Sequence, residues 1–445
     1  MSNTRGSWLA VLETRTHNAA SRCRKSLMEL FAGQPTRRRS DWRPWEVELL
    51  EVRQLLTSKF GSAPQAIYDS PALLYSPAEV LVTLSAASVG EQNAGGKGGS
   101  GTPSTNYSYS VVGNAADAAV NAISSGLALV GGGTDVDEVF RWMGTKANGG
   151  DFVVLRATGT NAYNSYIDRL VPALDSVATL VISTLAGAND PFVAQKIREA
   201  EAIFIAGGDQ ADYINLWKNT AVETAIYDAI ARLAPIGGTS AGLAVLSDYD
   251  FSARNGTITS AEALANPYDS RVTLDGGFLS EGDFIAERGS SQSVLRYLDY
   301  LITDSHFQQR DRMGRLVTFM ARMDADGLVP DAAPRGIGIN EQTALLVEAN
   351  GTARVVGNAY SGKLSVDNQR RAVYLLSATV VPTTVTAGVP LTYTNITVVK
   401  ADYDPNTGVG DTFDLVSWIG VGVTTYQLSA LNGALVSTQS GGAIY

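Results

Sequence analysis

The sequence predicts an α/β protein whose core is a doubly wound, mostly parallel sheet with helices on both faces. Short continuous apolar runs alternate with helical patterns between residues 127 and 236, which is typical of parallel strands buried on both faces. Glycine clusters at 131–133, 207–208 and 237–238 follow three of these runs. Because ligands bind beyond the carboxyl ends of the strands in such sheets, we expect the functional site at these clusters.

The individual elements follow from the same patterns. The apolar runs predict strands at 127–130, 152–155, 179–182, 202–206 and 234–236. The intervening periodicity predicts helices at 135–143, 163–170 and 191–200, with further helical segments up to residue 233. Residues 336–420 become strand-rich, with runs at 336–340, 343–347, 353–356, 372–376 and 396–399. These extra C-terminal strands either extend the main sheet or form a β-layer at its edge.

We expect three parts along the chain. Residues 1–115 form an N-terminal extension and Gly/Ser-rich linker, 116–425 form a catalytic α/β domain, and 426–445, small and polar, form a C-terminal tail. The first 60 residues hold 11 Lys and Arg against 6 Asp and Glu. This head is either an arm or targeting extension, or a poorly ordered docking extension. It lacks the features of a signal peptide, so cytoplasmic and secreted locations both stay open.

Composition removes several classes of function. The net charge of −10 argues against nucleic acid or an acidic membrane surface as a partner, and no apolar run reaches the length of a membrane span. Cys23 is the single cysteine, so neither an intrachain disulfide nor a cysteine-based metal site is possible. The only histidines are His17 and His306, which excludes zinc sites built on paired histidines. We therefore predict no metal.

The stretch Gly238-Thr239-Ser240-Ala241-Gly242 fits the G-x-S-x-G nucleophile elbow. A tight strand-to-helix turn exposes the serine hydroxyl and directs the following N–H groups, from Ala241 onward, at a reacting carbonyl. The two glycines leave the room that this turn needs. The alternative is a glycine-rich turn with a serine N-cap, so the partners of Ser240 must decide. The glycines at 131–133 lack the other residues of a nucleotide-binding motif, which disfavours a phosphate cradle.

A serine nucleophile needs a base, most often histidine, oriented by an acid. Since His17 lies in the basic head, His306 is the only histidine that the α/β body offers, although it also suits a charged helix start. Glu341, which follows the expected strand 336–340, is a natural candidate for the acid, and Asp304 is too near His306 in sequence for easy geometry. The order Ser, His, acid disfavours the α/β-hydrolase fold.

Two further features suit substrate binding. The N–H groups of Gly208 and Asp209 could complete an oxyanion hole, and Gln210 could hold substrate. Arginines at 310, 312 and 315 follow the histidine closely and offer bidentate sites for carboxylates, which favours an acidic substrate. The alternative is that these arginines pair with neighbouring acids on a helix face.

These segments resemble the cyanophycinases, serine peptidases of family S51 related to aspartyl dipeptidase (peptidase E). The resemblance covers roughly residues 120–420 and keeps order and spacing. It rests on Gly-Gly-Gly at 131–133, Phe-Arg-Trp at 140–142, Val-Leu-Arg-Ala at 154–157, Gly-Gly-Asp-Gln at 207–210, Gly-Gly-Thr-Ser-Ala-Gly at 237–242, Asp-Ser-His-Phe at 304–307 and Gly-Ile-Gly-Ile-Asn-Glu-Gln-Thr-Ala at 336–344.

The resemblance implies a fold similar to the class I glutamine amidotransferases, a homodimer, and no cofactor. It implies cleavage of cyanophycin, a poly-aspartate carrying arginine on each side chain, from its end to β-aspartyl-arginine dipeptides. The implied roles are Ser240 as nucleophile, His306 as base and Glu341 as orienting acid. The implied substrate-binding residues are Gln210, Asp304, Ser305, Arg310, Arg312 and Arg315.

The chain departs from the family pattern at two motifs. Cyanophycinases of the well-known kind carry Asp-Gln-His where this chain has Asp304-Ser305-His306, and Gly-Ile-Asp-Glu where it has Gly338-Ile339-Asn340-Glu341. That glutamine contacts substrate, and serine reaches less far. The departures bear on the substrate and not on the reaction type. A dipeptidase for N-terminal aspartyl peptides and a non-catalytic binding protein on the same fold are the alternatives.

Overall fold

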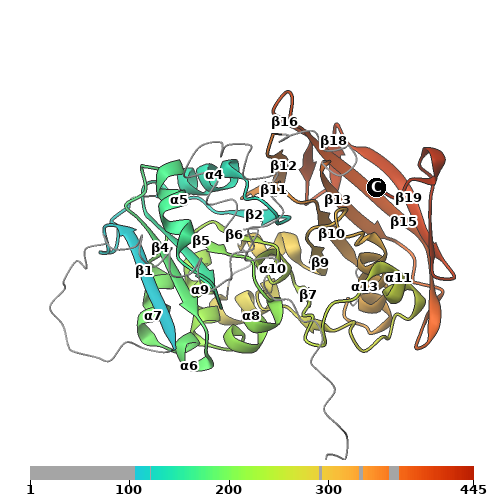
Figure 1. The fold of residues 1–445 in the computed structure, drawn as a ribbon, viewed down its shortest axis with the longest axis horizontal. Helices are drawn as coiled ribbons and strands as arrows, with labels where there is room; N and C mark the ends of the chain where they lie inside the picture. The colour runs from blue at the N-terminus through green and yellow to red at the C-terminus, as the bar shows by residue number, and fades with distance from the viewer. Residues whose placement is uncertain (1–105, 121, 290–292, 330–333, 360–369) are drawn as a thin grey trace, which may run out of the picture. The chain divides into compact units, whose positions relative to one another are not determined.

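The computed structural model divides the chain into two units, residues 1–95 and 96–445. It describes residues 106–445 except 121, 290–292, 330–333 and 360–369, all of them in the second unit. The predicted basic head, with Cys23 and His17, lies outside the described residues. Figure 1 shows the second unit as two groups of strands, each accompanied by helices.

The first sheet has ten strands in the order β1-β4-β3-β5-β6-β2-β11-β12-β17-β18. Their bounds are Tyr107–Gly113 (β1), Gly126–Val130 (β2), Asp151–Arg156 (β3), Ser176–Ile182 (β4), Ala202–Ile205 (β5), Ile236–Thr239 (β6), Thr343–Glu348 (β11), Thr352–Gly357 (β12), Thr412–Asp414 (β17) and Ile419–Val421 (β18). The centre, from β4 to β2, is parallel, whereas β1 and the strands from β11 to β18 pair antiparallel. The expected parallel sheet is therefore the centre of a wider mixed sheet.

Helices cover both faces of this parallel centre, as the doubly wound class requires. The helices are Asp137–Ala147 (α4), Ala162–Leu170 (α5), Leu185–Ala188 (α6), Pro191–Glu199 (α7), Gln210–Trp217 (α8) and Ala221–Ala231 (α9). Side chains of β2 alternate between two cores: Ala128 packs with α4 and α5, and Leu129 packs with α7, α8 and α9. Figure 1 shows these two groups of helices on opposite sides of the strands. The predicted α/β class is confirmed.

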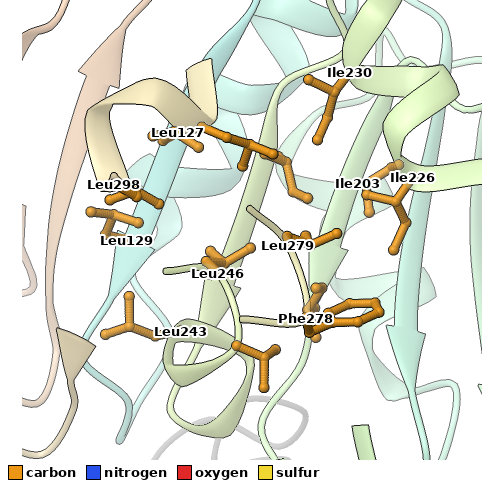
Figure 2. Close-up of a cluster of buried hydrophobic side chains, with 14 of the residues drawn as sticks. Leu127, Leu129, Ile203, Ile226, Ile230, Leu243, Leu246, Phe278, Leu279 and Leu298 are labelled. Carbon is orange, nitrogen blue, oxygen red and sulfur yellow. The ribbon is translucent and has the colours of Figure 1, made fainter. Parts of the chain in front are cut away.

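The core on the side of α7, α8 and α9 also contains side chains from the segment that follows β6. Leu127 of β2, Ile203 of β5, and Ile226 and Ile230 of α9 belong to one buried cluster, in which Leu243 lies nearer to Leu246 and Leu129 (Figure 2). Phe278, Leu279 and Leu298 pack on the same cluster; the first two precede Glu281–Arg288 (α12), and Leu298 ends Val294–Leu298 (η2). The elbow therefore packs against fully buried aliphatic side chains.

The second sheet has the main strand order β20-β19-β15-β13-β10-β9-β7-β8, with β14 and β16 paired to β15. Bounds are Tyr249–Phe251 (β7), Leu274–Gly276 (β8), Leu301–Asp304 (β9), Arg335–Ile339 (β10), Arg371–Ala378 (β13), Thr384–Thr386 (β14), Val389–Asp404 (β15), Val409–Gly410 (β16), Thr424–Leu431 (β19) and Ala434–Ser437 (β20). Only β7-β9 and β9-β10 are parallel. The helices Ser260–Ala265 (α11) and Met313–Ala325 (α13) pack on it through a separate core.

Three features differ from the sequence prediction. Residues 107–113, expected in the linker, form β1, which pairs along its whole length with β4. Residues 426–445 are not a tail: β19 and β20 complete the second sheet, and Tyr426, Leu428 and Ala430 are buried against β15. The strand-rich region takes both expected alternatives, because β11 and β12 extend the first sheet while β10, β13 and β15 build the second. Among the described residues, no helix is both long and apolar enough to cross a membrane.

Candidate active site

Ser240 lies on the tight turn between β6 and the short helix Ala241–Ala244 (α10). Its backbone is held at φ 55° and ψ −114°, a conformation that a serine adopts only where its surroundings enforce it. Close packing supplies that constraint. A Cβ on Gly238 would lie 2.3 Å from the Gly242 carbonyl oxygen, and a Cβ on Gly242 would lie 2.0 Å from the Ile205 oxygen. Both glycines of the predicted elbow are therefore required by space.

His306 follows the carboxyl end of β9, in the second sheet. Its N–H donates to the Gly131 carbonyl oxygen at 2.7 Å, and the N–H of Phe307 donates to the Ile339 oxygen at 3.1 Å. Its backbone φ is +47°, in the left-handed region. These bonds tie the histidine to the ends of β2 and β10 at once, so the residue bridges the two sheets.

The three predicted residues come together as a hydrogen-bonded chain. Ser240 Oγ lies 2.8 Å from His306 Nε2, and His306 Nδ1 lies 2.6 Å from Glu341 Oε1. Glu341 lies on the connection 340–342, which leads from β10 in the second sheet to β11 in the first. Asp304 makes no such contact with His306 and is not the orienting acid. Side chains in this order have the geometry of a nucleophile, a base and an acid that orients the base.

The triple glycine at 131–133 makes room for this chain. A Cβ on Gly132 would lie 2.6 Å from His306 Nε2, and a Cβ on Gly133 would lie 3.0 Å from the Cβ of Glu341. Both glycines have positive φ, 90° and 76°. The sequence predicted the functional site near this cluster, but the one role considered for the glycines themselves was a phosphate cradle, which was disfavoured. The position of the cluster at the end of the strand next to the elbow strand was the signal that pointed to the Ser–His–Glu site.

Burial and charge set the protonation of the base and its acid. Burial lowers the pKa of His306 below its usual value, and the bond to Glu341 offsets only part of this effect. The hydrogen bond to His306 lowers the pKa of Glu341, so its carboxylate stays ionised at neutral pH. The result is a neutral imidazole, able to accept a proton from Ser240, beside a fixed negative charge.

A buried ion cluster supports the loop that carries His306. Arg315 binds Asp304 in a bidentate manner, at 2.7 Å through Nε and 2.6 Å through Nη2, and Arg312 adds a bond at 3.1 Å. Burial acts to raise the pKa of Asp304, but the two guanidinium groups outweigh it and the pKa is lowered. The Arg315 guanidinium also lies over the rings of Phe251 and Phe319, 5.0 and 5.8 Å from their centroids. For these two arginines the structure fits the alternative interpretation of pairing with an acid.

All six predicted substrate-binding residues, and two of the three predicted for the oxyanion hole, line one cavity of about 90 Å³ beside Ser240. It is lined by Gly208, Gln210, Ser240, Ala241, Ala244, Phe251, Thr303, Asp304, Ser305, His306, Arg310, Arg312 and Arg315. Asp209 is not among them, and its carboxylate instead caps α8 by accepting from the N–H of Ala211. Gln210 donates to the Phe251 carbonyl oxygen at 3.2 Å.

Arg310 differs from the other two arginines of the cavity. It forms no ion pair or side-chain hydrogen bond with any residue in the part of the chain that the structure describes. Burial lowers its pKa, partly offset by Glu341. Arg312 and Arg315 are paired with Asp304, so Arg310 is the arginine of this cavity that is available to bind an anionic group of a ligand.

Sequence reasoning missed the side chains that connect the His306 loop to Glu341. Asn340 Oδ1 accepts from the N–H of Gln308 and its Nδ2 donates to Gln308 Oε1, while Gln309 Oε1 accepts from the N–H of Glu341 at 3.0 Å. No periodicity marks these contacts, because their partners lie 32 positions apart.

In the described ranges, no group of three or more His, Cys, Asp or Glu side chains is placed to hold a metal ion.

A partly exposed serine and a partly exposed glutamate, joined through a buried histidine, have the arrangement of a serine-hydrolase site. Residues 128–265 match the model of peptidase family S51. The cyanophycinase of Synechococcus elongatus is 28% identical over 199 residues, which cover 44% of this chain and 51% of the relative. The chain is therefore similar to cyanophycinases, and part of it matches peptidase family S51. It spans about half the length of the curated relatives it matches.

Two further similarities were found. The cyanophycinase of Trichormus variabilis is 27% identical over 166 residues, or 37% of this chain and 45% of the relative. Among solved structures, a peptidase from an acI-B1 Actinobacterium is similar with a TM-score of 0.36 and 18% identity, covering 53% of this chain and 89% of that one.

Proposed function

We propose that this chain is a serine-type exopeptidase that hydrolyses aspartyl or β-aspartyl peptide bonds. The leading substrate is cyanophycin, multi-L-arginyl-poly-L-aspartate, released as β-aspartyl-arginine dipeptides. The observation that carries the proposal is the hydrogen-bonded chain from Ser240 through His306 to Glu341, beside a cavity with an unpaired arginine. The S51 match and the cyanophycinase relatives support a peptidase, and the substrate is inferred from them.

The reaction follows from the roles of these groups. His306 Nε2 accepts the proton of Ser240 as Oγ attacks the carbonyl carbon, and Glu341 holds the opposite ring N–H. The negative oxygen that forms is stabilised by backbone N–H groups, with Ala241 of the elbow and Gly208, which follows β5, as the candidates. His306 then gives its proton to the leaving amine, and an acyl-enzyme remains. Water, deprotonated by His306, releases the acid and restores the serine.

The charge and size of the cavity support an acidic, short side chain at the cleaved bond. Arg310 offers a bidentate donor to a carboxylate. The cavity is small, about 90 Å³, which suits a short aspartyl group better than a long arginyl side chain. The arginine of a cyanophycin unit would therefore extend outside the cavity. The same small volume favours a second candidate function, cleavage of free aspartyl dipeptides.

The test is product analysis by mass spectrometry after incubation with cyanophycin granules and, separately, with aspartyl dipeptides. The variant is Ser240→Ala, and Ser183→Ala, an exposed serine after β4, is the matched control. We expect wild type and Ser183→Ala to release β-aspartyl-arginine, and Ser240→Ala to lose about 10⁴-fold or more of this activity. Cleavage of dipeptides alone would replace cyanophycin by the second candidate. If neither substrate is cut and a fluorophosphonate probe fails to label Ser240, the chain is a non-catalytic binding protein.

A further inference from the structure

The loop that carries the catalytic base is contacted by a distant part of the chain. We call residues 306–312 the His306 loop, and residues 439–445 the C-terminal segment. The ring of Tyr445 packs edge-on against Phe307, with centroids 5.9 Å apart, and against Tyr374 of β13 at 5.7 Å. Phe307 is fully buried and directly follows His306. The C-terminal segment therefore forms part of the packing behind the base.

The hydroxyl of Tyr445 completes the start of α13. The N–H of Met313, the first residue of this helix, donates to the Tyr445 oxygen at 3.0 Å, and the hydroxyl in turn donates to Asp311 Oδ1 at 2.9 Å. Arg312 holds the N-cap position of α13 but makes no side-chain cap hydrogen bond. A helix leaves its first N–H groups without intrahelical partners, so Tyr445 supplies the acceptor that the N-cap residue does not.

The His306 loop needs external anchors because its backbone is strained at both ends. His306 and Asp311 have φ values of +47° and +48°, and each such residue costs about 1–3 kcal/mol. The Asp311 carbonyl accepts from the hydroxyl of Ser260 in α11. Tyr445 adds the second anchor at Asp311. Arg310, the unpaired cation of the cavity, lies between these two strained positions.

The C-terminal segment is itself fixed to the second sheet. Tyr426 of β19 donates its hydroxyl to the Ile444 carbonyl at 2.6 Å, and Gln439 Nε2 donates to the Ala443 carbonyl at 2.8 Å. Tyr426 is buried, so this attachment is shielded from water. Tyr445 is therefore held by the sheet and in turn holds the loop.

We propose that Tyr445 is a positioning residue, which sets the His306 loop so that His306 meets Ser240 and Arg310 faces the cavity. This inference rests on the proposed function. Tyr445 touches no reacting atom, and α13 keeps a buried face of its own, including Leu316, Phe319 and Met320. Its loss should consequently loosen the loop and leave the fold in place.

The test compares Tyr445→Phe and Tyr445→Ala with Tyr268→Phe. Tyr268 is a matched control because its hydroxyl bonds Asp326 at the other end of α13, at 2.7 Å. Five quantities are measured. They are Tm, kcat and KM on the substrate that the wild type cleaves, the rate constant for fluorophosphonate labelling of Ser240, and amide hydrogen exchange of residues 306–313. Labelling reports the Ser–His pair without reference to substrate identity.

We expect Tyr445→Ala to lower kcat and the labelling rate at least tenfold, and Tyr445→Phe to lower both about threefold. Exchange at 307–313 should rise in both, while the Tm of Tyr445→Phe falls no more than that of Tyr268→Phe, whose activity and exchange there stay as in wild type. Unchanged labelling and exchange in Tyr445→Ala would overturn the proposal, and so would losses that merely follow Tm. If wild type is neither labelled nor active, the proposed function fails, and exchange at 307–313 still decides whether Tyr445 anchors the loop.

Discussion

The two halves of the candidate site are held by different forces. The serine half, β6 and α10, positions Ser240 by close apolar and backbone packing: Gly238 and Gly242 approach other backbone atoms so closely that no side chain fits. The histidine half, the end of β9 and the His306 loop, is held by side chains, among them the buried Asp304–Arg315 pair and the hydrogen bonds of Asn340. One half depends on space and the other on polar partners. Each should therefore fail under a different kind of change.

The largest loss of unfolding free energy is expected when the Asp304 carboxylate is removed from the histidine half. Asp304→Ala leaves Arg315 and Arg312 buried without their anion, which should cost about 3–5 kcal/mol of unfolding free energy. The control, Glu138→Ala, breaks the pair with Arg354, in which the two side chains are 44% and 42% exposed, and should cost less than about 1 kcal/mol. Denaturant unfolding measures both. Equal losses would mean that the buried cluster does not hold the loop.

If Asp304→Ala does not fold, Asp304→Asn keeps the shape and removes the charge. The pKa of Asp304 is lowered in the folded chain, so its contribution is present above the unfolded value near 3.8 and is lost as pH falls through the folded value. The Asp304 ion cluster therefore stops stabilising the His306 loop when acid protonates the carboxylate.

A smaller effect is expected from a single methyl group in the serine half. Gly242→Ala places a Cβ 2.0 Å from the Ile205 carbonyl oxygen, and such overpacking costs about 1–3 kcal/mol. It should also slow fluorophosphonate labelling, because the turn that carries Ser240 must shift. Gly282→Ala on α12 is the control, since its Cβ meets nothing nearer than 3.8 Å, and it should stabilise the chain slightly. A Gly242→Ala variant that unfolds and labels like wild type would contradict the role of close packing.

The smallest effect is a pH dependence of stability whose sign is opposite to that of Asp304, because the pKa of the carboxyl is raised and not lowered. Glu281, 3% exposed on α12 beside the serine half, has its pKa raised to about 7 by burial. A raised carboxyl pKa means that the folded chain takes up a proton, so stability falls as pH rises from the unfolded value of about 4.5 through about 7. Thermal unfolding should show Glu281→Gln equal to wild type at pH 5 and more stable at pH 8. The exposed Glu287→Gln should show no such divergence.

Sequence alone predicted what is local. The elbow around Ser240 is five consecutive residues, and the buried runs on either side of it are continuous. His306 followed from elimination, because the α/β body contains one histidine. Glu341 was a candidate because it follows a strand, and only the fold brings it within 2.6 Å of the histidine.

What the sequence could not predict depends on distant partners. Arg312 and Arg315 gave two equal interpretations until the structure paired both with Asp304. Residues 426–445 were expected to be a tail because small and polar residues dominate, yet Tyr426, Leu428 and Ala430 alternate toward a core that β15 supplies. A strand whose other residues are polar gives a weak signal until its partner strand is known.

The placement of the site across two sheets has a consequence for folding. Ser240 follows β6 of the first sheet, whereas His306 and Glu341 follow the neighbouring strands β9 and β10 of the second. A molecule in which only one sheet has formed therefore holds no Ser240–His306 pair. The serine gains its base only when both sheets are in place.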